Sequence, residues 1–315
     1  MRLSDLPVCK DKFGWPWKAN PLQHPETLPD GSRWPRISIV TPSYNQGQFI
    51  EETIRSVLFQ GYPNLEYIII DGGSTDNSVE IIKKYEPWLA YWVTEKDRGQ
   101  VHAINKGFAL ATGELAGWLN SDDIYFSGAL KIVAEHWVAA GRPVSLITGT
   151  KLKGDASLEV VTRLPQSPLT IQHLLKRSIL EQPSTFFPLN LFKDVGGLDE
   201  RYHNSLDYDL WLRMTRKGAG LYFTGVDLAI TRIHPLTKTS RFQRRSAYEA
   251  LQSVWRNYGV IPDPWIKKLI TAVVIPQSVK PGLVSKILYF VRDVLYKFSK
   301  MILGQLNLLA HHESE

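Results

Sequence analysis

The 315-residue sequence predicts an α/β protein with a mostly parallel, Rossmann-like sheet flanked by helices. Two observations lead to this prediction. Short β-rich runs alternate with amphipathic helical patterns from residue 36 onward, and such alternation is typical of a doubly wound parallel sheet. Hydrophobic residues make up 43% and charged residues 22% of the chain, the balance of a folded globular protein with a sizeable core.

The elements follow in order along the chain. The run Ile37–Thr41 predicts a strand, and the apolar spacing from Phe49 to Leu58 predicts the helix after it. The same unit repeats, with strands expected at 65–70, 90–94 and 115–119 and helices at 78–85 and 101–111. The pattern is less regular after Ser121, where we expect a mixed-sheet half with a helix at 129–140, a strand at 145–150, and helices at 208–217 and 240–258.

The two ends of the chain differ from this core in composition. Residues 1–35 are rich in Pro and Trp, which predicts an extended arm packed on the domain by its aromatic side chains. The tail from Pro281 predicts an amphipathic helix, with Phe290 and Phe298 among its apolar positions and Lys286 and Lys300 among its basic ones.

Composition also excludes some classes of protein. The single cysteine, Cys9, cannot form an internal disulfide, and no uncharged apolar run of about twenty residues is present. The first residues lack the apolar segment of a secretory signal, so we expect a cytoplasmic protein. The net charge of +6 is modest, and the basic residues cluster late, around Arg241–Arg245 and 280–300. This clustering favours an anionic surface over nucleic acid as a partner.

Ligands of such sheets bind beyond the carboxyl ends of the strands, so the polar residues there are candidates for a site. Asp71 ends the second predicted strand and is followed by Gly72 and Gly73, which allow a ligand to approach the backbone. A carboxylate at this position can accept a hydrogen bond from a nucleobase. The alternative is that the aspartates of this loop cap the next helix, and we favour that role for Asp76.

The strand at 115–119 runs directly into Asn120-Ser-Asp-Asp123. Adjacent carboxylates raise each other's pKa and destabilise a fold unless a cation neutralises them. Oxygen ligands of this kind select Mg²⁺ or Mn²⁺, which keep part of their coordination shell for substrate phosphates. A solvated turn with helix-capping aspartates is the alternative interpretation.

Three further residues are candidates by their position. Asp207, at the start of a predicted helix, could act as a general base, although an aspartate there also suits the helix dipole. Arg98 could pair with a phosphate or form a surface ion pair, and His234 could complete a metal shell or be structural.

The chain contains no Gly-x-Gly-x-x-Gly after a strand, no Walker motif and no Gly-x-Ser-x-Gly. Dinucleotide-dependent oxidoreductases, P-loop hydrolases and elbow-type hydrolases are therefore disfavoured.

Taken together, the segments beginning at residues 37, 97, 118 and 196 resemble the family 2 glycosyltransferases, and most closely the bacterial members acting on surface polysaccharides. They read ISIVTPSYNQGQFIEETIRSVLFQGYPNLEYIIIDGGSTDNS, DRGQVHAINKGFALATGE, WLNSDD and GGLDERYHNSLDYDLWLR. The resemblance spans about Arg36 to Thr239. It implies a GT-A fold, a divalent metal, and inversion at the anomeric carbon by a single displacement.

The resemblance also implies a role for each matching residue. Asp207 resembles the catalytic base, and Asp123 resembles the metal ligand of the Asp-x-Asp motif. The expected nucleotide-binding residues are Pro42, Ser43, Tyr44, Asn45, Asp71, Arg98 and Asp122, with His234 as a second candidate metal ligand. The chain departs from the family in two places: Leu206 precedes Asp207 where many members have Glu, and Asn120 and Ser121 alter the Asp-x-Asp motif.

These observations predict an inverting, Mn²⁺- or Mg²⁺-dependent transfer of a sugar from a nucleotide-sugar, UDP by default, to a saccharide or lipid-linked acceptor in cell-surface polysaccharide synthesis. We expect an arm at 1–35, a GT-A domain at 36–240 and a helical region at 241–315. The domain would divide into a nucleotide-binding half, 36–123, and an acceptor half, 124–240. The tail would attach peripherally to the inner face of the cell membrane or pack on protein. A sugar nucleotidyltransferase and a non-catalytic carbohydrate-binding protein of the same fold are the alternatives.

Overall fold

The computed structural model describes residues 3–7, 12–17, 21–150, 152–163, 168–234, 242–275 and 283–312. Cys9, Arg241, Lys280 and Pro281 lie outside these residues, as do the stretch 235–239 and the expected helix start at Ser240. The chain divides into two compact units, Met1–Leu174 with Ser178–Pro235 and Leu175–Arg177 with Leu236–Glu315. Each unit is described by itself.

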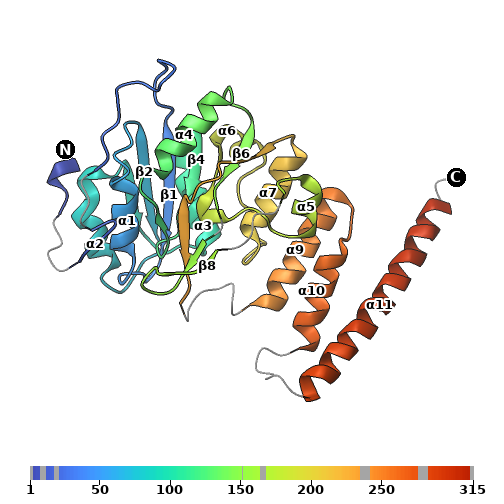
Figure 1. The fold of residues 1–315 in the computed structure, drawn as a ribbon. Helices are drawn as coiled ribbons and strands as arrows, with labels where there is room; N and C mark the ends of the chain where they lie inside the picture. The colour runs from blue at the N-terminus through green and yellow to red at the C-terminus, as the bar shows by residue number, and fades with distance from the viewer. Residues whose placement is uncertain are drawn as a thin grey trace. The chain divides into compact units, whose positions relative to one another are not determined.

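The first unit is built around a mixed sheet with helices on both faces, seen in the blue to yellow part of Figure 1. The sheet begins with four parallel strands in the order β4-β1-β2-β3. Their bounds are β1 Ile37–Ser43, β2 Leu65–Asp71, β3 Tyr91–Thr94 and β4 Leu115–Trp118, and they are connected by α1 Ile50–Leu58, α2 Ser78–Tyr85 and α3 Gln100–Leu110. All seven elements were predicted, with ends correct to within two residues.

The sheet continues beyond β4 through strands from the second half of the unit, which are less regular in sequence. β9 (Thr185–Pro188) lies antiparallel between β4 and β6 (Ser145–Thr148), and β10 (Gly220–Phe223) is parallel to β6. The described sheet therefore has seven strands in the order β10-β6-β9-β4-β1-β2-β3. The mixed-sheet half is confirmed, although the sequence predicted only β6 among these three strands.

A second sheet of four short strands, in the order β5-β11-β7-β8, completes the described part of this unit. Its bounds are β5 Ile124–Tyr125, β7 Leu152–Gly154, β8 Val160–Arg163 and β11 Ala229–Arg232. Because Ile230 of β11 pairs with Ile124 of β5, the end of β11 is brought beside the acidic turn that precedes β5. None of these four strands was predicted, since each has only two to four residues.

The two faces of the main sheet bury different cores because side chains alternate along a strand. Ile39 of β1 shares a core with apolar side chains of α1, α2 and α4 (Ala129–Ala139). Its neighbour Val40 contacts α3 so closely that a β-carbon on Gly107 would lie 2.5 Å from Val40 Cγ1. On the face of the sheet covered by α3, aromatic side chains also contact α6 (Leu189–Asp194) and α7 (Leu206–Arg216). Phe108 of α3 and Phe192 of α6 make one such contact.

The N-terminal arm packs on this unit through aromatic side chains, as its composition predicts. Trp17 and Trp34 are only 7% and 3% exposed. Arg55 of α1 is buried beneath the arm, where its guanidinium donates to the carbonyl oxygens of Pro7, Pro16 and Trp17. These donated bonds satisfy the buried charge and fix the described parts of the arm on α1.

The second unit is helical, with α9 (Gln243–Tyr258), α10 (Asp263–Val274) and α11 (Leu283–His312). Within it α10 packs against both of the other helices, and Lys300 Nζ of α11 lies 2.7 Å from Asp263 Oδ1 of α10. The sequence predicted α9 and α11 but not α10. Helix α5 (Ile171–Lys176) crosses the boundary between the two units.

Candidate functional site

The predicted site residues gather where the parallel strands end. The register pairs Ser43 at the end of β1 with Asp71 at the end of β2, and Asp71 with Thr94 at the end of β3. On the other side of β1, Val40 pairs with Trp118, the last residue of β4. The loops that follow all four strands therefore meet along one edge of the sheet, the edge at which open parallel sheets bind ligands.

Asp71 is fully buried at this edge, and its carboxylate orders its own loop. Asp71 Oδ2 accepts hydrogen bonds from the backbone N–H groups of Gly73 and Ser74 at 3.1 and 2.9 Å. It also accepts one from Thr94 Oγ1 at 2.7 Å, and Ser74 Oγ donates to Asp71 Oδ1 at 2.5 Å. Both carboxylate oxygens are thus committed to protein donors, and the expected contact of Asp71 with a base stays a prediction.

The loop after β1 is tied to the loop after β2 by hydrogen bonds in both directions. Asn45, with a φ of 51°, donates its backbone N–H to Ser74 Oγ and accepts from the Thr75 N–H through Oδ1. Asp76 accepts from the backbone of Gly47 and from that of Ser78, the first residue of α2. Asp76 therefore serves the start of α2, as predicted, and also joins the two loops.

Two predicted nucleotide-binding residues of the first loop, Tyr44 and Ser43, differ in exposure. Tyr44 presents a ring that is 60% exposed. Ser43 is only 4% exposed, and its Oγ has no hydrogen-bond partner among the described residues. Pro42, between Thr41 and Ser43, pairs with Ile70 inside the sheet, so it shapes the loop base. Of these residues, only Tyr44 presents a side chain to solvent at this edge.

The acidic turn Asn120–Asp123 follows β4. Asp123 is 2% exposed; its Oδ1 accepts the backbone N–H of Arg232 at 2.9 Å, and its Oδ2 accepts from Asn120 Nδ2 at 3.3 Å. Burial and the neighbouring charge of Asp122 raise the pKa of the Asp123 carboxyl well above its usual value. The turn therefore holds a carboxylate whose negative charge a nearby cation would stabilise.

Asp122 and His234 meet at the same turn. His234 Nε2 lies 2.9 Å from Asp122 Oδ2, and the imidazole ring packs against Phe49 with ring centroids 5.1 Å apart. Carboxylate oxygens and an imidazole nitrogen are suitable ligands for Mn²⁺. Over the described ranges, no group of three or more His, Cys, Asp or Glu side chains already has the arrangement of a metal site.

Arg232 was not predicted, although it is the residue that secures the acidic turn. It is 3% exposed, and its Nε donates to the Asp122 carbonyl oxygen at 2.8 Å. Its NH2 group lies 2.6 Å from Glu52 Oε2, and its guanidinium also donates to the carbonyl of Ala156. The sequence could have indicated Arg232, because the apolar run Leu228–Ile230 before it is typical of a buried strand that ends near this residue.

The amide side chain of Gln182 links the acidic turn to the end of β4. It donates to the Trp118 carbonyl oxygen at 2.5 Å and accepts from Asn120 Nδ2 at 2.9 Å. Trp118 stacks on Trp211 of α7, with ring centroids 5.6 Å apart and an interplanar angle of 23°. This stack anchors α7 beside the end of β4.

Asp207 lies in the first turn of α7, partly buried. Its neighbour Asp209 is 2% exposed and pairs with Arg213 one turn later, Nε to Oδ2 at 2.7 Å. Since Asp209 is held in that ion pair, Asp207 is the aspartate of this helix turn that reaches solvent. The helix predicted at 208–217 is present as α7, which begins two residues earlier, at Leu206.

Arg98 forms an exposed ion pair with Glu200, NH2 to Oε1 at 2.7 Å, which matches the alternative given for it from sequence. The hydrogen bond from Arg98 lowers the pKa of the Glu200 carboxyl. A contact of Arg98 with phosphate would require this surface pair to open, and such pairs contribute little to stability.

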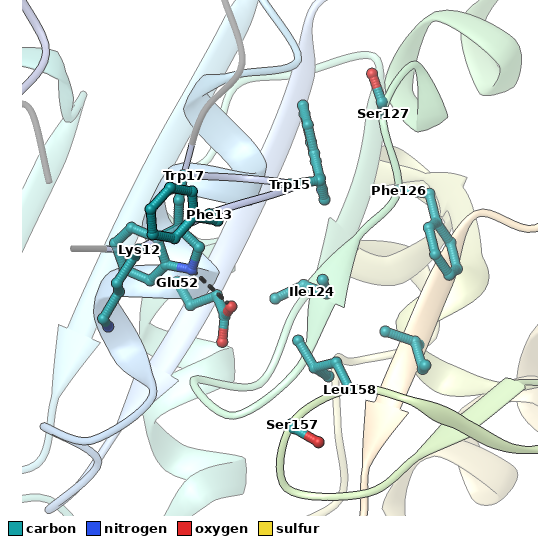
Figure 2. A pocket seen from close by; sticks show the side chains of 11 residues that line it. Lys12, Phe13, Trp15, Trp17, Glu52, Ile124, Phe126, Ser127, Ser157 and Leu158 are labelled. Atoms are coloured by element: carbon teal, nitrogen blue, oxygen red, sulfur yellow. Dashed lines mark hydrogen bonds between the residues drawn. The ribbon is translucent and has the colours of Figure 1, made fainter. Parts of the chain in front are cut away.

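A pocket of about 480 Å³ lies between the arm, α1 and the second sheet, and Figure 2 shows its side chains. Trp15, Ile124 and Phe126 line it, and the Glu52 carboxylate points toward Trp17. Trp17 Nε1 donates to Glu52 Oε1 at 2.9 Å, while the other Glu52 oxygen binds Arg232. The pocket therefore borders the residues that secure the acidic turn.

The fold is an α/β sheet whose parallel strands end in polar loops along one edge, with an acidic turn after the fourth strand. Residues 38–188 match the model of "Glycosyl transferase family 2". An uncharacterized glycosyltransferase of Mycobacterium tuberculosis is 32% identical over 181 residues, which cover 57% of this chain and 68% of the relative. The chain belongs to glycosyltransferase family 2 and is a glycosyltransferase.

Other relatives agree with this assignment. An uncharacterized glycosyltransferase of Rickettsia typhi is 29% identical over 231 residues, 70% of this chain and 71% of the relative. Among solved structures, Staphylococcus aureus TarS 1–349 in complex with UDP-GlcNAc has a TM-score of 0.57 at 15% identity, covering 82% of this chain and 79% of TarS. The mannosyltransferase PcManGT from Pyrobaculum calidifontis, in complex with GDP-Man and Mn²⁺, also gives 0.57, at 18% identity and with 85% and 84% covered. The fold is therefore GT-A, as the resemblance implied.

Proposed function

We propose that this glycosyltransferase transfers a sugar, with inversion, from a uridine diphosphate sugar to a hydroxyl of a saccharide or lipid-linked acceptor in cell-surface polysaccharide synthesis. The observation that carries the proposal is the buried Asp123 beside Asp122 in the turn after β4, at the edge of the sheet where β1 and β2 also end. Support comes from the fold neighbours, whose structures contain UDP-GlcNAc or GDP-Man.

A divalent cation fits the donor set at the acidic turn. Asp122, Asp123 and His234 would hold it, and Mn²⁺ or Mg²⁺ suits these oxygen and imidazole ligands. When bound, the cation would neutralise charge on the diphosphate leaving group. It would also offset the buried negative charge of Asp123, since Arg232 contacts the Asp123 carboxylate through its backbone N–H.

Asp207 is the residue we propose as general base. A sugar hydroxyl is a poor nucleophile near neutral pH, so a carboxylate within hydrogen-bond reach has to accept its proton. In the proposed step the acceptor oxygen forms a bond to the anomeric carbon as the bond from that carbon to the diphosphate oxygen breaks. The proton passes to the Asp207 carboxylate, and the nucleoside diphosphate leaves.

The direct test is a set of melting temperatures of the full chain with UDP, GDP, dTDP and ADP, each with and without Mn²⁺. A ligand that binds only the folded state raises the melting temperature. We expect a rise with UDP that depends on Mn²⁺. The absence of any nucleotide-dependent rise would contradict the donor site, and release of pyrophosphate from a nucleoside triphosphate would point to nucleotidyl transfer instead.

We also propose that α11 lies on an anionic membrane surface, where a lipid-linked acceptor would be found. The described helix exposes large apolar side chains, among them Phe290 at 69% and Phe298 at 55%. Basic residues Lys286, Lys297 and Lys300 lie on the same helix. No described helix is long and apolar enough to cross a membrane. An apolar face flanked by cations is the pattern of an interfacial helix.

Vesicle co-sedimentation tests this attachment. The wild-type chain should bind vesicles containing anionic lipid and lose binding when Phe290 and Phe298 are both changed to Ser. Changing exposed Tyr248 of α9 to Ser provides a control for loss of an aromatic side chain elsewhere in the same unit. Equal binding by all three proteins would contradict the role of α11.

A further inference from the structure

We propose that the pocket between the arm, α1 and the second sheet binds a sugar residue of the saccharide acceptor or of its glycosylated product. The source of that sugar rests on the proposed function, whereas the class of ligand rests on the lining of the pocket. None of the residues that line it is among those proposed to bind the nucleotide or the metal or to act as general base. The pocket would therefore hold the saccharide by a unit other than the one that reacts.

Aromatic side chains form one part of the lining. Phe13, Trp15 and Phe126 line the pocket (Figure 2), and Phe13 is 70% exposed. Trp15 and Phe126 pack against Ile124 of β5 and Ile230 of β11, whose side chains are buried at 4% and 1% exposure. This packing holds the two rings in place. The C–H bonds on the faces of a pyranose ring are apolar, so a sugar can contact these rings through its faces.

Glu52 forms the polar part of the lining. Its side chain is 20% exposed, and each of its oxygens accepts one hydrogen bond. Trp17 Nε1 donates to Oε1 at 2.9 Å, and the NH2 group of Arg232 donates to Oε2 at 2.6 Å. An ionised carboxylate can accept about four hydrogen bonds, so each oxygen has capacity for one more. Two neighbouring hydroxyls of a sugar are donors that match the two oxygens.

Lys12 and Ser127 add groups that bind hydroxyl oxygens. Both side chains are exposed and line the pocket. An ammonium group donates hydrogen bonds, and a serine hydroxyl both donates and accepts. The lining thus combines aromatic rings, a fixed acceptor and two donors. A neutral ring that carries several hydroxyls uses all three kinds of contact.

Other classes of small ligand fit this lining less well. A quaternary ammonium would meet a like charge, because Lys12 Nζ already lies 3.9 Å from the centroid of the Trp17 ring. Inorganic phosphate would be repelled by the Glu52 carboxylate and would leave the rings unused. A fatty acyl chain would remove water from Glu52 and Lys12 without offering either a hydrogen bond, which costs free energy.

The pocket is also connected to the acidic turn. Ile124 directly follows Asp123 in the chain. Glu52 pairs with Arg232, whose backbone N–H binds Asp123 Oδ1 at 2.9 Å. The volume of about 480 Å³ lies within the range of about 300–1,000 Å³ that is usual for small-ligand sites. A sugar bound to Glu52 would therefore keep the rest of its saccharide close to the donor site between transfers.

Saturation-transfer NMR of the full chain tests the pocket, with the methyl glycosides of glucose, galactose, mannose and N-acetylglucosamine as probes. Each probe is measured alone and with UDP and Mg²⁺. We expect at least one glycoside to bind, and its signal to persist when UDP and Mg²⁺ are added. If none of the four binds, or if UDP and Mg²⁺ displace the one that does, the assignment of the pocket is overturned.

Two variants at exposed positions locate the binding. Ser127→Trp places a large ring in the pocket and should abolish glycoside binding. Phe13→Ala should weaken it about tenfold, the change in affinity that one aromatic contact of ordinary strength supplies. Tyr91→Ala removes an exposed aromatic ring of β3 that does not line the pocket, so this control should bind as the wild type does. Equal binding by all four proteins would place the sugar elsewhere and overturn the assignment.

The melting temperatures with UDP separate this proposal from the proposed function. If UDP with Mn²⁺ raises the melting temperature but no glycoside binds, the assignment of the pocket fails and the donor site stands. If a glycoside binds and Ser127→Trp abolishes its binding while no nucleotide raises the melting temperature, the proposed function fails and the sugar-binding pocket stands.

Discussion

Arg232 donates its backbone N–H to Asp123 Oδ1 over 2.9 Å, although the two residues are 109 positions apart in the chain. The same arginine holds the Asp122 carbonyl with its side chain and pairs with Glu52. A strand from the end of the first unit thus secures the acidic turn that follows β4. Three predictions concern this turn and the proposed base, and a fourth concerns the buried carboxylate of Glu66 near the start of β2.

The first prediction concerns the buried ion pair itself. Arg232→Met should lower the free energy of unfolding by about 3–5 kcal/mol, because the partly buried Glu52 would lose its cation and the turn its donor. Arg163→Met, which removes the exposed pair with Asp227, should cost less than about 1 kcal/mol. Urea unfolding of the wild type and the two variants measures both values. Equal losses of unfolding free energy would show that the Arg232 pair contributes no more to stability than the exposed Arg163 pair.

The second prediction concerns metal binding. Mn²⁺ alone should raise the melting temperature of the wild type, since a ligand of the folded state stabilises it. Asp123→Asn and His234→Asn should each reduce that rise, because each removes a proposed ligand. In the absence of metal, Asp123→Asn should melt no lower than the wild type, since a buried charge beside Asp122 has been removed.

If Mn²⁺ raised the melting temperature of both variants as much as that of the wild type, the metal would not be bound at the acidic turn. His173→Asn, which removes a partly exposed imidazole outside the acidic turn, is the control, and its response to Mn²⁺ should equal that of the wild type.

The third prediction concerns Asp207. Asp207→Asn should lower the turnover number about 10²- to 10⁴-fold, the usual contribution of a general base, because the amide cannot accept the hydroxyl proton. The dissociation constant for UDP with Mn²⁺ should stay within about twofold of wild type. Turnover is measured as release of nucleoside diphosphate from the donor, and near-normal turnover in the variant would remove Asp207 from this role.

The fourth prediction concerns pH. Burial raises the pKa of Glu66, but hydrogen bonds from Ser38 and Thr112 outweigh burial and leave this pKa below its ordinary value of 4.5. The carboxylate therefore stabilises the fold above the pKa of the unfolded chain, and this stabilisation is lost as the pH falls through the lower folded pKa.

Glu66→Gln should accordingly destabilise the protein by about 1.5–3 kcal/mol at pH 7, since the amide cannot accept all four bonds. The difference from wild type should shrink as the pH falls below about 4.5. Unfolding by urea at pH 7, 5 and 4 measures it, and a difference that is constant with pH would contradict the assignment to Glu66.

The nucleotide-binding half could be predicted from sequence because its strands and helices are long and periodic. Asp71 and Asp123 were correctly located at strand ends, since a buried run followed by polar residues indicates that edge. The hydrogen bonds of Asp71 could not be predicted, because they depend on Thr94 in another strand and on the local turn. A strand-end carboxylate that binds a ligand and one that orders its loop have the same sequence pattern.

The second half was less predictable for physical reasons. Strands of two to four residues give no usable alternation, so β5, β7 and β11 were missed, and Arg232 was missed with them. The contact between Gly72 and Asp97 could likewise not be predicted: a β-carbon on Gly72 would lie 2.8 Å from Asp97 Oδ2, because the loop after β3 folds over the end of β2.

The reversed strand β9 has a consequence for synthesis of the chain on the ribosome. β1 to β4 lie within residues 37–118, but the partner of β4 at its outer edge begins only at Thr185. While the intervening segment is made, the backbone N–H and C=O groups along that side of β4 have no strand beside them, and an unpaired edge invites pairing with another chain. Nascent chains shorter than about Pro188 are thus the ones most exposed to self-association, and chaperones would be needed most at that length.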